Sequence, residues 1–156
     1  MNKTNNHQYL GLILAITVLV LDQVTKLLIV QFQAENPPAA IIPGFFRLVY
    51  TTNPGAAWGI LADHTAFLTV ASLLVMAVLI WRFEAMVQGW RERAAALSIL
   101  MGGVAGNLVD RIFRQEVVDF IDLHFRGYHW PAFNVADAAI CVGIGLYVIS
   151  VFWRDE

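Results

Sequence analysis

The stretch that decides the fold is residues 10–30, LGLILAITVLVLDQVTKLLIV, an apolar run whose two charges, Asp22 and Lys26, lie in its second half. An α-helix needs about 20 such residues to cross the roughly 30 Å hydrocarbon core of a bilayer. A soluble amphipathic helix would present a polar face along its whole length, and this run has none. The stretch therefore predicts a membrane-spanning helix.

Three further apolar runs follow at 66–83, 94–113 and 135–153. Over all 156 residues, 58% are hydrophobic and only 14% are charged, with a mean hydropathy of +0.62. Soluble domains carry about 25% charged residues. We therefore expect one membrane domain over 1–156, an all-α bundle of four transmembrane helices. The net charge of −2 offers no basic surface for nucleic acid.

Basic residues indicate how the bundle is oriented. Four spans place both termini, and the short connection 84–93, on one side of the membrane. That side also holds most of the cations: Lys3, Arg82, Arg91, Arg93 and Arg154. The positive-inside rule then predicts cytoplasmic termini, with the long connections 31–64 and 114–134 on the outer face. Because Asp22 and Lys26 interrupt the first run, we interpret it as an uncleaved span.

Residues 45–50 of the first outer connection form an aromatic, strand-like run. Turn-forming residues flank it at Pro43-Gly44 and at Asn53-Pro54-Gly55. The pattern predicts a small β-sheet at the outer membrane interface, where aromatic side chains are favoured.

Three glycines, Gly102, Gly103 and Gly106, lie within the third run. In lipid, small residues allow helix backbones to approach closely. We expect this helix to pack tightly against its neighbours.

Polar residues within the spans gather at the outer ends. Those near the end of the first span, the end of the third and the start of the fourth are Asp22, Lys26, Asn107, Asp110, Arg111, Asn134 and Asp137. Asn53, Asp119 and Asp122 join them from the outer connections. A charge at the bilayer centre costs roughly 2.5–3.5 kcal/mol. Such a concentration on one face indicates pairing, a functional site, or both.

Some of these charges have evident partners. Asp22 and Lys26 are four residues apart on one helix, with the acid first, which is the better orientation for an ion pair. Asp110 could pair with Arg111 or with Lys26. An ion network that holds the helices together explains these residues as well as a binding site does, and it does not exclude that they line one.

Asp119 and Asp137 lack an evident basic partner. Asp119 lies in an apolar setting, and Asp137 lies in the first turn of the fourth span, where Asn134 is a plausible N-cap. Asp137 could simply complement the helix dipole. If the two carboxylates meet, they would share one proton, so that one acts as a base on water and the other as an acid. The helix N-terminus favours Asp137 as the ionised member.

Other chemistries are less well supported. His124 and His129, with Asp119 and Asp122, match no zinc-binding spacing, and we expect these histidines to be interfacial or solvated. The serines do not lie near the outer face. A small proton- or ion-handling protein would spread its charges through the bilayer depth. A non-enzymatic scaffold would leave the unpaired Asp119 and Asp137 unexplained.

The chain resembles the lipoprotein signal peptidases (signal peptidase II, an aspartyl peptidase family). The segments that carry the resemblance are DQVTK at 22–26, NPGAAWG at 53–59, GGVAGNLVDR at 102–111, VVDFID at 117–122 and FNVAD at 133–137. They follow the order of the family along almost the whole chain. Trp58 and Val104 are small departures, at positions where phenylalanine and alanine are common.

The resemblance implies a cofactor-free and metal-free aspartyl dyad, Asp119 and Asp137. It implies removal of the signal peptide from diacylglyceryl-modified prolipoproteins, with cleavage before the lipidated cysteine. It further implies a multi-pass location in the bacterial inner membrane, in contact with lipid, sensitivity to globomycin-type inhibitors, and no requirement for oligomers. The positions that it assigns to substrate or inhibitor binding are Asp22, Lys26, Asn53, Gly55, Asn107, Asp110, Arg111 and Asn134.

Overall fold

The computed structural model describes residues 3–33, 35–55 and 64–154. Within these ranges four helices are long and apolar enough to cross a membrane, which confirms the predicted bundle. They are α1 Lys3–Gln33, α2 Thr65–Val87, α3 Arg91–Phe113 and α4 Val135–Arg154. The Trp58 segment lies outside the described residues.

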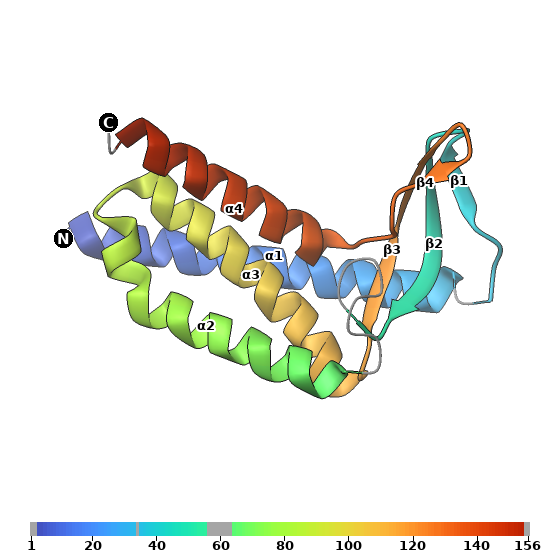
Figure 1. Cartoon of the computed structure of the whole chain (residues 1–156), viewed down its shortest axis with the longest axis horizontal. Helices are drawn as coiled ribbons and strands as arrows, with labels where there is room; N and C mark the ends of the chain where they lie inside the picture. Colours follow the sequence, from blue (N-terminus) through green and yellow to red (C-terminus); the bar gives the residue numbers. More distant parts are fainter. Residues whose placement is uncertain (1–2, 34, 56–63, 155–156) are drawn as a thin grey trace.

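Helix α3 is the centre of the bundle and contacts each of the other three helices. Both termini and the α2–α3 connection lie at one end of the bundle (Figure 1), as the alternation of spans requires. Near that end, Leu79 and Val87 of α2 pack on Ala94 and Leu97 of α3.

Glycines allow the close approach of α3 to α1 and α4. A Cβ atom on Gly102 would lie 2.7 Å from the carbonyl oxygen of Ala15 in α1. One on Gly103 would lie 2.5 Å from the carbonyl oxygen of Ala136 in α4. The backbones therefore touch where a side chain would separate them, which confirms the packing role predicted for this cluster.

The other end of the bundle carries an antiparallel sheet with strand order β1-β2-β3-β4. Its strands are β1 Ala39–Ile42, β2 Phe46–Asn53, β3 Val117–Phe125 and β4 Tyr128–His129. The sheet projects from the bundle at the end opposite the termini (Figure 1), as expected for an interfacial sheet. β2 includes residues 46–50 of the predicted strand-like run.

Strand β3 was not predicted, because its sequence does not alternate between apolar and polar residues. Val117, Val118, Asp119 and Phe120 are all buried, so both faces of the strand are covered. On the helix side, Val118 and Phe120 pack with Ile29 of α1. A strand that is buried on both faces lacks the period of two that identifies half-exposed strands.

Backbone hydrogen bonds attach the start of α4 to β3. The Phe133 carbonyl accepts hydrogen bonds from the N–H groups of Phe120 and Ile121, at 3.0 and 2.8 Å. The Phe133 N–H donates to the Ile121 carbonyl at 3.1 Å. This clamp places the first turn of α4 beside the middle of β3, and so brings Asp137 to the side of Asp119.

Two glycines of α4 provide a matched test of the helix packing. A Cβ atom on Gly143 would lie 2.7 Å from the Leu100 backbone nitrogen, whereas one on Gly145 would meet nothing within 4 Å. We predict that Gly143→Ala lowers the free energy of unfolding by about 1–3 kcal/mol through overpacking. Gly145→Ala should leave it unchanged or raise it, because alanine favours helix. Thermal unfolding in detergent measures both, and equal effects of the two variants would contradict the packing assignment.

Candidate active site

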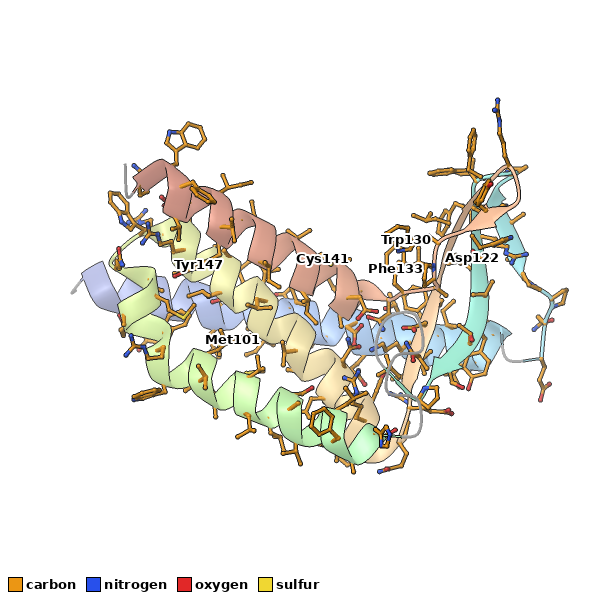
Figure 2. The ribbon with its side chains drawn as sticks, in the orientation of Figure 1. Met101, Asp122, Trp130, Phe133, Cys141 and Tyr147 are labelled. Atoms are coloured by element: carbon orange, nitrogen blue, oxygen red, sulfur yellow. The ribbon has the colours of Figure 1, made fainter. Side chains whose placement is uncertain are left out.

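A cavity of about 460 Å³ lies where α3, β3 and the start of α4 meet. It contains both carboxylates that the sequence singled out, Asp119 and Asp137. The other lining residues are Asn53, Gly55, Asn107, Arg111, Val117, Trp130, Pro131, Ala132, Phe133, Ala138, Ile140 and Cys141. Figure 2 shows Trp130 and Phe133 between the helices and the sheet, and Cys141 further along α4. The wall is mostly apolar, with its polar groups around the two carboxylates.

Asp119 projects from β3 and is almost completely buried, with 3% of its surface exposed. Its Oδ1 accepts a hydrogen bond from Nδ2 of Asn134 at 2.7 Å, and its Oδ2 accepts one from Nδ2 of Asn53 at 3.2 Å. Burial, followed by the negative charge of Asp137, raises the pKa of Asp119 to about 7. The amide donors lower this pKa, but by less than burial raises it.

Asp137 and Asn134 cap the N-terminus of α4 reciprocally. The Asp137 N–H donates to Oδ1 of Asn134 at 2.9 Å, and the Asn134 N–H donates to Oδ2 of Asp137 at 3.2 Å. The predicted N-cap is thereby confirmed. Capping uses only one oxygen of Asp137. Its Oδ1 accepts a hydrogen bond from Nδ2 of Asn107 at 2.7 Å, within the cavity.

Two asparagines thus hold the two carboxylates, and they also touch each other. Nδ2 of Asn134 lies 3.2 Å from Oδ1 of Asn107. Because each amide directs its nitrogen at a carboxylate, its oxygen must face another donor. For Asn134 that donor is the Asp137 N–H, and for Asn107 it is the ammonium group of Lys26, 3.1 Å away.

Lys26 forms the charged centre of the network. Its ammonium nitrogen lies 2.8 Å from Oδ2 of Asp22 and 2.8 Å from Oδ2 of Asp110, and all three side chains are fully buried. With Asn107 as its third acceptor, Lys26 uses all three of its N–H donors. The predicted Asp22–Lys26 pair is confirmed.

The two acids that pair with Lys26 also bind backbone groups. Oδ1 of Asp22 accepts a hydrogen bond from the Ala136 N–H in the first turn of α4, at 2.9 Å. Oδ2 of Asp110 accepts one from the Val118 N–H of β3, at 3.2 Å. Each acid therefore fixes an element that carries one of the cavity carboxylates.

Four residues expected to contact substrate do not reach the cavity. Asp22, Lys26, Asp110 and Asn134 each have 0% of their surface exposed, and none of them lines the wall. In the structure these side chains contact the carboxylates, the amides that hold them and the helix ends, and their assignment to substrate or inhibitor binding stays a prediction. Asn53, Gly55, Asn107 and Arg111 do line the cavity, as expected.

The two arginines near the end of α3 have different roles. Asp110 pairs with Arg114, one turn further along the chain, rather than with Arg111. Arg111 instead lines the cavity, where its Nη2 lies 3.4 Å from the Gly55 carbonyl oxygen. Sequence reasoning missed Arg114, although its i, i+4 spacing from Asp110 was a usable signal.

Gln23 was also missed, and no local signal identified it. Its Nε2, which has two hydrogens to donate, lies 3.1–3.2 Å from three acceptors: side-chain oxygens of Asp22 and Asp110 and the Gly106 carbonyl oxygen. Its Oε1 accepts a hydrogen bond from Arg114 at 3.3 Å. Gln23 therefore links Asp22, Asp110 and Arg114 through contacts that do not involve Lys26.

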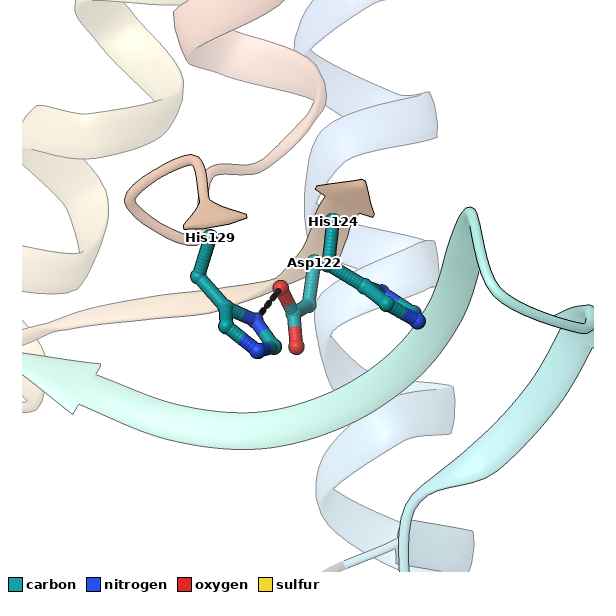
Figure 3. A group of neighbouring side chains, drawn as sticks. All are labelled: Asp122, His124 and His129. Atoms are coloured by element: carbon teal, nitrogen blue, oxygen red, sulfur yellow. Dashed lines mark hydrogen bonds and ion pairs between the residues drawn. The ribbon is translucent and has the colours of Figure 1, made fainter. Parts of the chain in front are cut away.

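His124 and His129, which we expected to be interfacial or solvated, lie on either side of Asp122 (Figure 3); His129 is exposed and His124 is half-buried. Nδ1 of His129 lies 3.1 Å from Oδ1 of Asp122, and Arg47 pairs with the other carboxylate oxygen. Burial by itself would raise the pKa of Asp122, but the contacts with His129 and Arg47 together hold it below its ordinary value. This cluster lies outside the cavity lining.

Comparison with known proteins gives consistent matches over almost the whole chain. The family model described as Signal peptidase (SPase) II matches residues 14–153. The lipoprotein signal peptidase of Syntrophotalea carbinolica is 42% identical, over 92% of this chain and 91% of its own. That of Bacillus pumilus is 41% identical, over 89% and 90%.

Two solved structures described as bacterial membrane enzymes share the fold. One, determined at 2.3 Å, has a TM-score of 0.87 and 33% sequence identity, and covers 94% of this chain and 89% of its own. The other, determined at 1.9 Å, has a TM-score of 0.83 and 34% identity, with 94% of each chain covered.

The Lys26 network leads to a stability prediction. Lys26→Met leaves the carboxylates of Asp22 and Asp110 buried without their shared cation, which should cost about 3–5 kcal/mol of folding free energy. Neutralising both acids as well, in Asp22→Asn/Lys26→Met/Asp110→Asn, should recover part of that loss. Thermal unfolding of the purified proteins in detergent provides the comparison. If Lys26→Met unfolds at the same temperature as the wild-type protein, the proposed stabilising role of Lys26 is wrong.

Proposed function

Because the chain belongs to the signal peptidase II family, whose members remove signal peptides from prolipoproteins, we propose that it does so as an aspartic endopeptidase with Asp119 and Asp137 as its catalytic pair. The observation that carries the assignment is that these two carboxylates face one cavity and are held by neutral amides. Asp22 and Asp110, in contrast, are committed to a buried cation.

The two carboxylates divide the chemistry between them. With a pKa of about 7, Asp119 is substantially protonated at neutral pH and serves as the acid. Asp137 takes a proton from water, and the resulting hydroxide attacks the scissile carbonyl carbon while Asp119 protonates the carbonyl oxygen. As this tetrahedral intermediate collapses, Asp119 takes back a proton from one of its hydroxyl groups, the C–N bond breaks, and Asp137 gives the proton that it took from water to the leaving amine. One shared proton is sufficient for both roles.

The substrate is a prolipoprotein with a diacylglyceryl-modified cysteine, cleaved immediately before that cysteine. The position of the cavity supports this substrate, because the cavity lies at the sheet end of the helices and extends along α4 as far as Cys141. Acyl chains can remain in the bilayer while the peptide bond reaches the carboxylates. Asn53 and Arg111 line this cavity, where an extended substrate backbone needs hydrogen-bond partners in lipid.

The same family membership supports an inner-membrane location with cytoplasmic termini and an outward-facing site. Globomycin-type cyclic peptides would occupy the same cavity as the substrate. A single chain supplies every group of the proposed dyad and of its supporting network, so oligomers are not required for the chemistry.

A proton- or ion-handling role is the alternative, and the burial of the charges disfavours it. Transport needs a cation site that can exchange its occupant along a path through the bilayer. Lys26 has all of its donors engaged by buried partners, and the three charges of this network, on Asp22, Lys26 and Asp110, lie together at one end of the helices.

Replacing either member of the dyad tests the assignment directly. Asp119→Asn and Asp137→Asn should each lower the rate of processing at least about 100-fold, because each removes an acid–base group. Asp122→Asn is the matched control: it removes a carboxylate from the same strand but outside the cavity, and should retain processing. The assay is the size shift of a lipidated prolipoprotein incubated with purified enzyme. Substantial cleavage by either dyad variant, with its fold intact, would overturn the assignment.

The raised pKa of Asp119 predicts a falling alkaline limb in the pH–rate profile. As the pH rises through about 7, Asp119 loses its proton, so the dyad lacks its acid and the rate declines. Asn53→Ala removes a hydrogen bond that stabilises the ionised carboxylate, and should therefore move this limb to higher pH. The measurement is kcat/KM against pH for both proteins. A limb that stays in place or moves to lower pH in the variant would contradict the proposed role of Asp119.

A further inference from the structure

A second group of metal-ligating side chains lies on the sheet, outside the proposed catalytic cavity. Asp122 and His124 project from β3 and His129 from β4, and each offers one ligand atom within 4.8 Å of the other two. Figure 3 shows the carboxylate of Asp122 between the two imidazole rings. The rings themselves are nearly parallel, with centroids 5.2 Å apart.

We propose that Asp122, His124 and His129 form a binding site for a divalent transition-metal ion of the zinc type. Two imidazoles and one carboxylate are a common zinc ligand set, with metal–ligand distances of about 2.0–2.2 Å. In a tetrahedral site these distances place neighbouring ligand atoms about 3.3–3.5 Å apart. Nδ1 of His129 and Oδ1 of Asp122 are 3.1 Å apart, so this pair is already close to that spacing.

His124 provides an independent indication of a ligand. Its Nδ1 is buried and has no hydrogen-bond partner in the part of the chain that the structure describes. Buried polar atoms are nearly always satisfied, so an orphaned ring nitrogen needs a partner. Coordination of His124 Nδ1 to an ion beside Asp122 would give this nitrogen the partner that the described residues do not provide.

Arg47 is the competing cation and sets the electrostatics of the site. It pairs with Oδ2 of Asp122 and leaves Oδ1 directed at His129. The Arg47 side chain is 37% exposed, so it can move into solvent when an ion arrives. Metal affinity should therefore increase when Arg47 is neutralised.

The position of the site connects it to the catalytic cavity. His129 is followed directly by Trp130, Pro131, Ala132 and Phe133, all of which line the cavity. An ion that joins β3 to β4 would fix the start of this segment, while the hydrogen bonds between Phe133 and Ile121 already fix its end. Metal occupancy would thereby stiffen one wall of the cavity without touching the carboxylates.

Zinc titration of the purified protein tests the proposal without relying on activity. The parent is the untagged Asp119→Asn/Asp137→Asn chain in detergent, so that the dyad cannot bind the ion, and zinc is titrated in competition with a chromophoric chelator. We expect one zinc ion per chain, and affinity at least about tenfold weaker in His124→Ala and in His129→Ala. His64→Ala is the matched control, because His64 is an exposed histidine that precedes α2, and it should bind as the parent does.

Arg47→Gln separates a metal site from a hydrogen-bonded cluster. Zinc should bind this variant more tightly than the parent and should raise its thermal unfolding temperature further. Circular dichroism and unfolding without zinc show whether each histidine variant is folded, and the glutamine variant of the same histidine replaces an alanine variant that is not. The proposal is overturned if the parent binds no zinc, if both histidine variants bind as the parent does, or if Arg47→Gln weakens binding.

Discussion

The ammonium group of Lys26 is the constraint on which the rest of the structure depends. This charge is fully buried, and it is stable there only because its three N–H groups donate hydrogen bonds to Asp22, Asp110 and Asn107. Removing such a charge from water costs several kcal/mol, which only close, well-directed partners can offset. Because Asp110 and Asn107 belong to α3, these contacts fix the position of α1 relative to α3.

The residues around Lys26 also bind α4 and β3, the elements that carry the proposed catalytic pair. Asp22 binds the first turn of α4, and Asp110 binds the start of β3. The Lys26 ammonium also orients the Asn107 amide, whose nitrogen then faces Asp137. The charged network and the proposed dyad are therefore one structure with two functions. Asp22 and Asp110 pair with a cation and hold the helices and β3 in place, whereas Asp119 and Asp137, which accept hydrogen bonds from amides, are the carboxylates that we propose exchange protons.

The difference between the two kinds of acid also explains the depth of the site. Fully paired charges can lie inside the bundle, whereas a carboxylate that must exchange protons needs access to water. Asp119 and Asp137 face a cavity at the sheet end of the helices, and the sheet covers the end of the bundle that the charges occupy. Since the cavity wall is mostly apolar, a lipid-bearing substrate and a hydrolytic reaction can share it.

Local features of the chain determined the membrane spans, the Asp22–Lys26 pair, the Asn134 cap and the tight packing of the glycine cluster. Each depends on hydropathy over about 20 residues or on contacts within one turn of helix, so neighbouring residues carry the information. The same local reading identified Asp119 and Asp137 by their lack of a nearby cation, and the family motifs named them.

Only the tertiary structure decided which polar residues reach the cavity. Lys26 and Asn107 are 81 positions apart, and Asp22 and Ala136 are 114 apart. No local pattern records such contacts, because they arise from the packing of α1, α3 and α4. For the same reason β3, the link through Gln23 and the gathering of His124 and His129 around Asp122 could not be predicted. The sequence by itself determined which residues could carry charge in the membrane, and the packing of the helices and the sheet decided which of them are buried supports and which face the cavity.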